Sequence, residues 1–282
     1  MSPAERRPDR PIRVVVFGGG PRLERGPQLF IQRLMAQPEI ELLAVFCQSS
    51  GRGLGPVARD LWRRRRLLAL PLLLMGLLEG AGRLITHPRR ELNLRRQFRT
   101  LAGRLHFVAD THAPAVLAEV LRLRPDLGLI YGSPILRPEL FELPRQGTLG
   151  IHHGALPKYR GKKTTFWALY QGEERAGVTI QRVNAGLDTG QIVMEGSVAA
   201  GGRSLGRVWR ELEALGLDLY IRAILAVRDG TAVFGPQSGP RGRLYRDPRL
   251  RDLVAFQARR WRLRPGEATT PTEAPMSRRR LS

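Results

Sequence analysis

Apolar residues gather along the chain in short continuous runs, which are separated by glycines or by segments with apolar positions three or four residues apart. The first run, residues 12–17, is largely β-branched and is followed by Gly18, Gly19 and Gly20. Such a run is typical of a buried parallel strand that ends in a tight turn. A helical segment at about 23–37 and a second apolar run at 41–47 follow. This order predicts a right-handed βαβ unit.

The same alternation of strand and helix patterns resumes after residue 104. Strands are predicted at 105–109, 126–131, 148–152, 177–183 and 191–198, and helices at 113–123, 164–171 and 204–228. This alternation predicts an α/β fold, with a Rossmann-like, mostly parallel sheet flanked by helices in a single main domain.

Residues 51–104 interrupt the pattern and are interpreted as a helical insertion. Four consecutive arginines at 63–66 precede the segment 67–78, which is apolar except for Pro71 and Gly76. That segment is too short to span a bilayer, so a core helix or a helical hairpin is expected. The alternative is an interfacial anchor whose arginines meet lipid headgroups, which would give peripheral membrane contact through 61–78.

Three regions follow from these patterns. Residues 1–10 are polar and are expected to form a flexible arm, and residues 11–235 to form the α/β domain with its basic and apolar insertion at about 51–104. Residues 236–282 form a basic C-terminal extension. It is rich in Pro, Thr, Glu and Arg from about residue 264, where disorder is predicted.

The charge and the cysteine content narrow the possible functions. The formal net charge is +22, but only three of the 47 basic residues are lysines, and the arginines are spread along the whole chain. This distribution favours solvated surfaces in a protein from a GC-rich genome over a nucleic-acid partner, which remains the alternative. A single cysteine, Cys47, excludes a disulfide framework, and no metal site is expected. The N-terminus lacks a secretory signal, so a cytoplasmic protein is expected, with membrane association as the alternative.

Two glycine-rich clusters carry residues that could act as acid and base. His152 lies in the segment GIHHGALPKYRG, at the carboxyl end of a predicted strand, where open α/β sheets bind their ligands. Asp188 lies in the segment GLDTG, whose glycines allow a ligand to approach the backbone. Taken singly, each residue is more often structural. Together they form a pair in which the carboxylate favours an imidazolium that can donate to an oxyanion.

Because both motifs occur within it, the segment 126–198 resembles the catalytic domain of the folate-dependent formyltransferases. That family has an Asn-x-His motif, a Leu-Pro-x-Tyr/Trp-Arg-Gly segment and an Asp in a Gly-x-Asp-Thr-Gly loop. The matching stretches here are IHHGALPKYRG and GVTIQRVNAGLDTGQIV. The resemblance implies transfer of a formyl group from 10-formyltetrahydrofolate to an amine acceptor.

The resemblance also implies roles for individual residues. His152 would stabilise the oxyanion that forms when the amine attacks the formyl group. Asp188 would set the protonation of His152 and handle the proton through water. The positions implied to bind the folate are Gly132, Ser133, Leu136 and Val183.

One departure from the family motif affects the expected chemistry. The family asparagine, a donor to the oxyanion, falls on Gly150, which has no side chain. Loss of such a donor lowers kcat by about 10²–10³. His153 could replace it, although successive residues of a strand alternate between its faces. Otherwise water fills the gap, or the domain binds its ligand without transferring a formyl group.

The acceptor stays open, as does the oligomeric state. A small-molecule amine, an amino sugar or a nucleotide is expected. Pro21 removes a backbone N–H that could hold a phosphate, which argues against glycinamide ribonucleotide. A formyltetrahydrofolate hydrolase, with water as acceptor, is the alternative enzyme. The segment after residue 235 is short and polar, so the C-terminal domain typical of a methionyl-tRNA formyltransferase is not expected.

Overall fold

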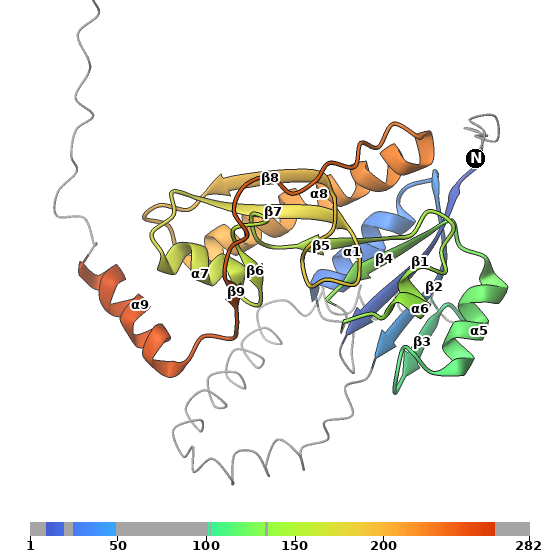
Figure 1. The fold of residues 1–282 in the computed structure, drawn as a ribbon, viewed down its shortest axis with the longest axis horizontal. Helices are drawn as coiled ribbons and strands as arrows, with labels where there is room; N and C mark the ends of the chain where they lie inside the picture. The colour runs from blue at the N-terminus through green and yellow to red at the C-terminus, as the bar shows by residue number, and fades with distance from the viewer. Residues whose placement is uncertain (1–9, 20–24, 49–100, 102, 133–134, 263–282) are drawn as a thin grey trace, which may run out of the picture.

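The computed structural model describes residues 10–19, 25–48, 101, 103–132 and 135–262. Its main feature is a seven-stranded sheet in the order β3-β2-β1-β4-β5-β7-β8 (Figure 1). In chain order these strands are β1 (Ile12–Gly19), β2 (Ile40–Gln48), β3 (Leu105–Val108), β4 (Leu127–Tyr131), β5 (Thr148–His152), β7 (Arg175–Arg182) and β8 (Ile192–Ala199).

The sheet is parallel from β3 to β5, and β7 and β8 then add two antiparallel pairings. The strand order reverses direction between β1 and β4. In open α/β sheets the crevice beyond the carboxyl ends of the strands near such a reversal is the usual ligand site. The predicted α/β fold with a mostly parallel sheet is confirmed.

Helices cover both faces of the sheet (Figure 1). The alternation of side chains along β1 explains how both faces are buried. Val14 and Val16 pack in the cluster that contains α1 (Arg25–Met35) and α8 (Leu205–Asp229). Val15 and Phe17 pack in the second cluster, with α5 (Pro114–Leu123) and α6 (Pro138–Phe141). Because successive residues of a strand point to opposite faces, one apolar run supplies both cores.

The long helix α8 has clear end signals in the sequence. Ser204 precedes it and accepts a hydrogen bond from the Arg207 N–H at 3.3 Å, and Gly230 ends it with a φ of 67°. A serine N-cap and a left-handed glycine C-cap satisfy backbone groups that a helix end otherwise leaves free. The helix predicted at 204–228 is therefore confirmed.

Tyr220 of α8 reaches between β4 and β5 where these strands separate. Its side chain is fully buried, and its hydroxyl oxygen accepts from the Ile130 N–H at 3.0 Å. The same hydroxyl donates to the Leu149 carbonyl at 2.7 Å. One side chain therefore satisfies backbone groups of two adjacent strands close to the carboxyl end of the sheet.

The segment after α8 contains elements that the sequence patterns did not predict. It forms β9 (Leu244–Tyr245), which pairs with β6 (Arg160–Gly161), and α9 (Leu250–Arg262). Helix α7 (Thr164–Tyr170) lies next to this segment, with Trp167 stacked on Tyr245.

Several expectations concern residues outside the described ranges. They are the flexible arm before residue 10, nearly all of the insertion at 51–104, the membrane contact through 61–78 and the disorder from about residue 264. Within the described ranges, no helix combines the length and the hydropathy that crossing a bilayer requires.

We predict that Tyr220→Phe lowers the free energy of unfolding by about 1–3 kcal/mol, because it leaves buried backbone groups of β4 and β5 without a partner. Urea denaturation measures this change. Tyr170→Phe, at a partly exposed position where the ring contacts are retained, is the matched control. Equal stability of the two variants would contradict the bridging role.

Candidate active site

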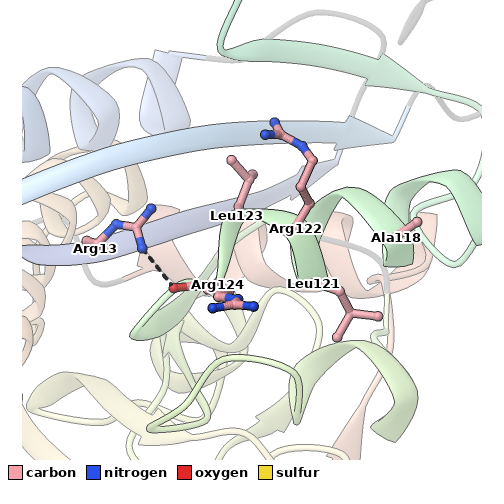
Figure 2. Close-up of a pocket in the computed structure, with 6 residues that line it drawn as sticks. All are labelled: Arg13, Ala118, Leu121, Arg122, Leu123 and Arg124. Carbon is pink, nitrogen blue, oxygen red and sulfur yellow. Dashed lines mark hydrogen bonds between the residues drawn. The ribbon is translucent and has the colours of Figure 1, made fainter.

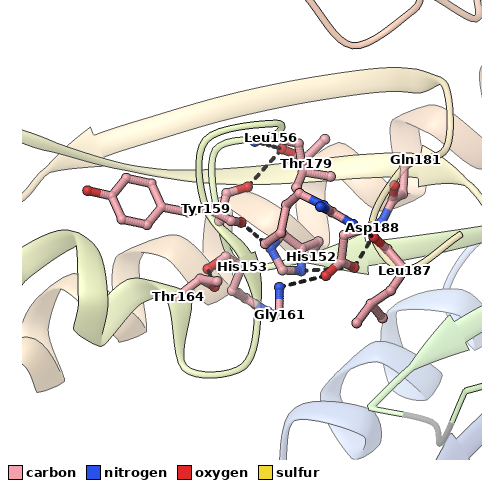
Figure 3. A network of polar contacts seen from close by, with 12 residues as sticks. His152, His153, Leu156, Tyr159, Gly161, Thr164, Thr179, Gln181, Leu187 and Asp188 are labelled. Atoms are coloured by element: carbon pink, nitrogen blue, oxygen red, sulfur yellow. Dashed lines mark hydrogen bonds and ion pairs between the residues drawn. The ribbon is translucent and has the colours of Figure 1, made fainter. Parts of the chain in front are cut away.

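The structure brings His152 and Asp188 together from two separate segments (Figure 3). His152 is the last residue of β5, and Asp188 lies in the loop between β7 and β8. His152 Nδ1 is 3.4 Å from Asp188 Oδ1, and the two side chains are 9% and 13% exposed. Because water is largely excluded from both groups, their electrostatic interaction is stronger than it would be on the surface.

The second ring nitrogen of His152 faces a backbone carbonyl. Nε2 lies 2.7 Å from the carbonyl oxygen of Tyr159, which can only accept, so Nε2 carries a proton. With a carboxylate near Nδ1 and a carbonyl at Nε2, both nitrogens face acceptors. The ring is therefore held on two sides by hydrogen-bond acceptors.

Gly154 makes the contact between His152 and the Tyr159 carbonyl possible. A Cβ at residue 154 would lie 2.6 Å from His152 Nε2 and 2.6 Å from the Tyr159 oxygen. Real Cβ atoms do not approach other atoms this closely, so a side chain at residue 154 would displace the ring or the loop. The glycine after the double histidine thus has a steric function.

Asp188 is held in an uncommon backbone conformation by the loop around it. Its φ is 51°, in the left-handed region that few non-glycine residues adopt. Asn184 braces the loop by accepting from the Gly186 N–H at 3.1 Å and by donating to the Thr189 carbonyl at 3.2 Å. Such a side chain–backbone turn fixes the local chain direction.

Both oxygens of the Asp188 carboxylate have protein partners. Oδ2 accepts from the Gly161 N–H at 2.7 Å, and Oδ1 accepts from Gln181 Nε2 at 3.4 Å (Figure 3). Gln181 also accepts from the Gly190 N–H at 3.1 Å. The carboxylate is therefore oriented toward His152 by groups from β6 and β7.

His153 does not join the pair. Its ring packs in a tilted arrangement against Trp209 of α8, with 4.6 Å between the ring centroids, and makes an edge contact with Tyr131. Burial, together with the neighbouring His152, lowers the pKa of His153 to about 4, so its ring is neutral at pH 7. His152 and His153 thus lie on opposite faces of the sheet, as alternation along a strand requires.

The residues expected to bind the folate lie near the same edge of the sheet, in different environments. Gly132 follows β4 with a φ of 65° and open space around its Cα. Leu136 is buried in the cluster with α5 and α6, and Val183 packs partly against that cluster. Ser133 lies outside the described residues.

Gly150, where the family motif has asparagine, lies on the His152 side of β5. A Cβ there would be 3.4 Å from Val183 Cγ2 and 3.8 Å from Ile130 Cβ, which are ordinary contact distances. The site therefore has space for the first atom of a side chain.

Sequence patterns did not identify four groups of this site. They are Gln181, the Tyr159 carbonyl, the Gly161 N–H and Gln237, which contacts the Asp188 loop. The two backbone groups belong to the Leu-Pro-x-Tyr-Arg-Gly segment, so its match was the available signal. Gln181 likewise belongs to the matching stretch GVTIQRVNAGLDTGQIV, whereas no comparable signal marked Gln237.

A surface pocket lies at the opposite end of the sheet and takes no part in this site (Figure 2). It is lined by Arg13, Ala118, Leu121, Arg122, Leu123 and Arg124. Arg13 is at the start of β1 and donates to the Arg124 carbonyl at 3.3 Å, just before β4 begins. The pocket therefore lies at the amino ends of the strands, whereas His152 ends its strand. In the part of the chain that the structure describes, no cluster of side chains could hold a metal ion.

Solved structures share this fold. A sugar N-formyltransferase from a Shewanella species has a TM-score of 0.55 at 14% identity, over 87% of this chain and 86% of that one. A glycinamide ribonucleotide transformylase from Symbiobacterium toebii has a TM-score of 0.54 at 20% identity, over 84% and 95%. At such low identity the likeness concerns the fold alone.

Curated relatives also match by sequence, among them two that are named methionyl-tRNA formyltransferase. The protein of Geobacter metallireducens is 40% identical over 90 residues, which is 32% of this chain and 29% of that protein. The protein of Roseiflexus castenholzii is 28% identical over 233 residues, or 80% of this chain and 63% of that protein. The matches thus span less than two thirds of either relative.

The family match covers the segment that holds the candidate site. Residues 102–224 match the family described as formyl transferase. His152, Tyr159, Gly161, Gln181 and Asp188, which make up the buried polar network, all lie within these limits. The chain is therefore similar to the formyl transferase family over the segment that holds the candidate site.

Proposed function

We propose that this protein transfers a formyl group from 10-formyltetrahydrofolate to a small amine acceptor, with His152 and Asp188 as the catalytic pair. The observation that carries the proposal is the buried contact of 3.4 Å between His152 Nδ1 and Asp188 Oδ1 inside the segment that matches the formyl transferase family. A histidine that a carboxylate holds in place suits a reaction in which negative charge develops on a carbonyl oxygen, because its ring N–H can donate to that oxygen.

The proposed reaction is an acyl transfer in two steps. The amine nitrogen attacks the formyl carbon, and the carbonyl electrons move to oxygen, where a hydrogen bond from the Nε2–H of His152 stabilises them. The bond from carbon to the folate nitrogen then breaks, and the electrons return to re-form the carbonyl. The amine loses a proton, which Asp188 passes through water to the departing nitrogen.

Substrate binding must change one contact of His152. In the free protein the Nε2–H is bound to the Tyr159 carbonyl, so it is not directed at a ligand. We propose that the formyl oxygen takes the place of that carbonyl as the acceptor of the Nε2–H. Catalytic hydrogen bonds often reach their final geometry only when the substrate is bound.

The residues around Gly150 fit the face of a flat ring. Val183 and Ile130 offer carbon atoms at this position, and Gly150 adds no side chain in front of them. Gly132 leaves the space beside the end of β4 open. These residues, with Leu136 behind them, would hold the pterin of the folate, which supplies the formyl group.

The acceptor is proposed only as an amine. The relatives and the similar structures carry names that refer to methionyl-tRNA, a ribonucleotide and sugars. An acceptor panel for this protein therefore includes amino sugars, sugar nucleotides and ribonucleotide amines.

Gly150 supports a second candidate function, a domain that binds folate without transferring its formyl group. The family asparagine would supply a donor to the oxyanion, and glycine supplies none. The position of His153 on the α8 face favours water over His153 as the substitute donor.

We predict that His152→Ala and Asp188→Asn each lower kcat for formyl transfer by about 10²–10⁴, because they remove the hydrogen-bond donor or the carboxylate that holds it. Formation of tetrahydrofolate is followed with and without each acceptor. Asp229→Asn, at the exposed end of α8, is the control.

Undiminished turnover in both variants would exclude the pair as the catalytic groups. Formate released at the same rate without any amine would identify the protein as a hydrolase instead.

We predict that Gly150→Asn raises kcat by about 10²–10³ if the missing donor limits the chemistry. Gly150→Ala is the matched control, since it adds the same Cβ beside Val183 without the amide. Both variants are assayed with the acceptor that wild type uses, or with the full panel. The same rate in the two variants would show that the donor is not limiting.

A further inference from the structure

The segment that follows α8 crosses back over the loops of the candidate site. Residues 235–246, which we call the strap, begin where Gly235 exchanges two backbone hydrogen bonds with Ile192, at 2.8 and 2.9 Å. The strap then meets the loop after β5, where the Gly242 N–H donates to the Pro157 carbonyl at 3.0 Å. The strap therefore contacts both the loop that carries Asp188 and the loop that follows His152.

Gln237 of the strap contacts the loop that carries Asp188. Its Nε2 donates to the Asp188 carbonyl at 3.1 Å and to the Gly190 carbonyl at 2.9 Å. These two carbonyls flank Thr189. The amide thus fixes the backbone at the residue whose φ of 51° determines where the carboxylate points.

The rest of the strap holds the opposite side of the pair. In β9, Tyr245 accepts from the Lys162 N–H at 3.0 Å, and its ring stacks on that of Tyr159 at 5.4 Å. The Tyr159 carbonyl faces His152 Nε2, and the Gly161 N–H donates to Asp188 Oδ2. The strap therefore touches the partners of both catalytic side chains.

We propose that Gln237 is the positioning residue for Asp188. Its side-chain amide locks the left-handed turn that aims the carboxylate at His152. This inference rests on the proposed function, because it assigns Gln237 to the reaction that His152 and Asp188 carry out. Gln237 acts through the loop and does not itself touch the substrate.

The chemistry of the contact requires an amide at position 237. Both partners of Nε2 are carbonyl oxygens, which only accept, so the side chain must donate twice. Glutamate has the same shape but would place a carboxylate oxygen against two carbonyls. Gln237→Glu is therefore an isosteric change that turns two attractions into repulsions.

We predict that Gln237→Glu lowers kcat by about 10- to 100-fold, because a small misplacement of a catalytic group is costly. The dissociation constant for 10-formyltetrahydrofolate, measured by calorimetry, stays within about twofold of the wild-type value, because Gln237 acts on the catalytic loop and does not bind the donor. Gln257→Glu, an exposed position on α9, introduces the same charge change without a loop contact and is the control.

A second readout needs no substrate. The ring signals of His152 are assigned among the five histidines by their loss in His152→Ala, and are then recorded by NMR in each variant. Gln237→Glu and the uncharged Gln237→Ala are expected to shift these signals in the direction that Asp188→Asn shifts them. Gln237→Ala keeps the test valid if the glutamate variant does not fold.

The two readouts separate the two proposals. If wild type transfers no formyl group to any acceptor, the proposed function fails, while the His152 signals still test the link between Gln237 and Asp188. If both Gln237 variants retain the wild-type signals of His152 and the wild-type kcat, the positioning role is overturned.

Discussion

The placement of one imidazole ring determines the arrangement of the candidate site. His152 lies between the carboxylate of Asp188 and the carbonyl of Tyr159, and both of its nitrogens are engaged. The ring fits there because Gly154 has no side chain to occupy the same space. The Gly161 N–H and the amide of Gln181 orient the carboxylate of Asp188.

The sheet supports this arrangement from its other face. Tyr220 bridges β4 and β5 with its hydroxyl where the strands separate, so their carboxyl ends open without leaving backbone groups unsatisfied. The edge that opens carries Gly132 at the end of β4 and His152 at the end of β5. A buried tyrosine on the α8 side thus supports the strand ends that carry the candidate site on the opposite face.

Local sequence signals predicted the parts of the structure that depend on local chemistry. The apolar runs at 12–17 and 41–47 became β1 and β2, and the pairing of His152 with Asp188 followed from two motifs read together. The strap could not be predicted in this way, because β9 is two residues long and Gln237 has no periodic context. Its contacts join residues 47 and 49 positions apart, and such contacts leave no pattern within a single segment.

The strap extends the structural support of the candidate site beyond the segment that matches the family. The match to the family described as formyl transferase ends at residue 224, yet the amide that braces the Asp188 turn comes from residue 237. A module cut at the limits of the family match would therefore lack residues that support the Asp188 loop. Transplanting the module into another protein, or trimming it for crystallisation, must therefore follow the hydrogen bonds of the loop and extend through Tyr245.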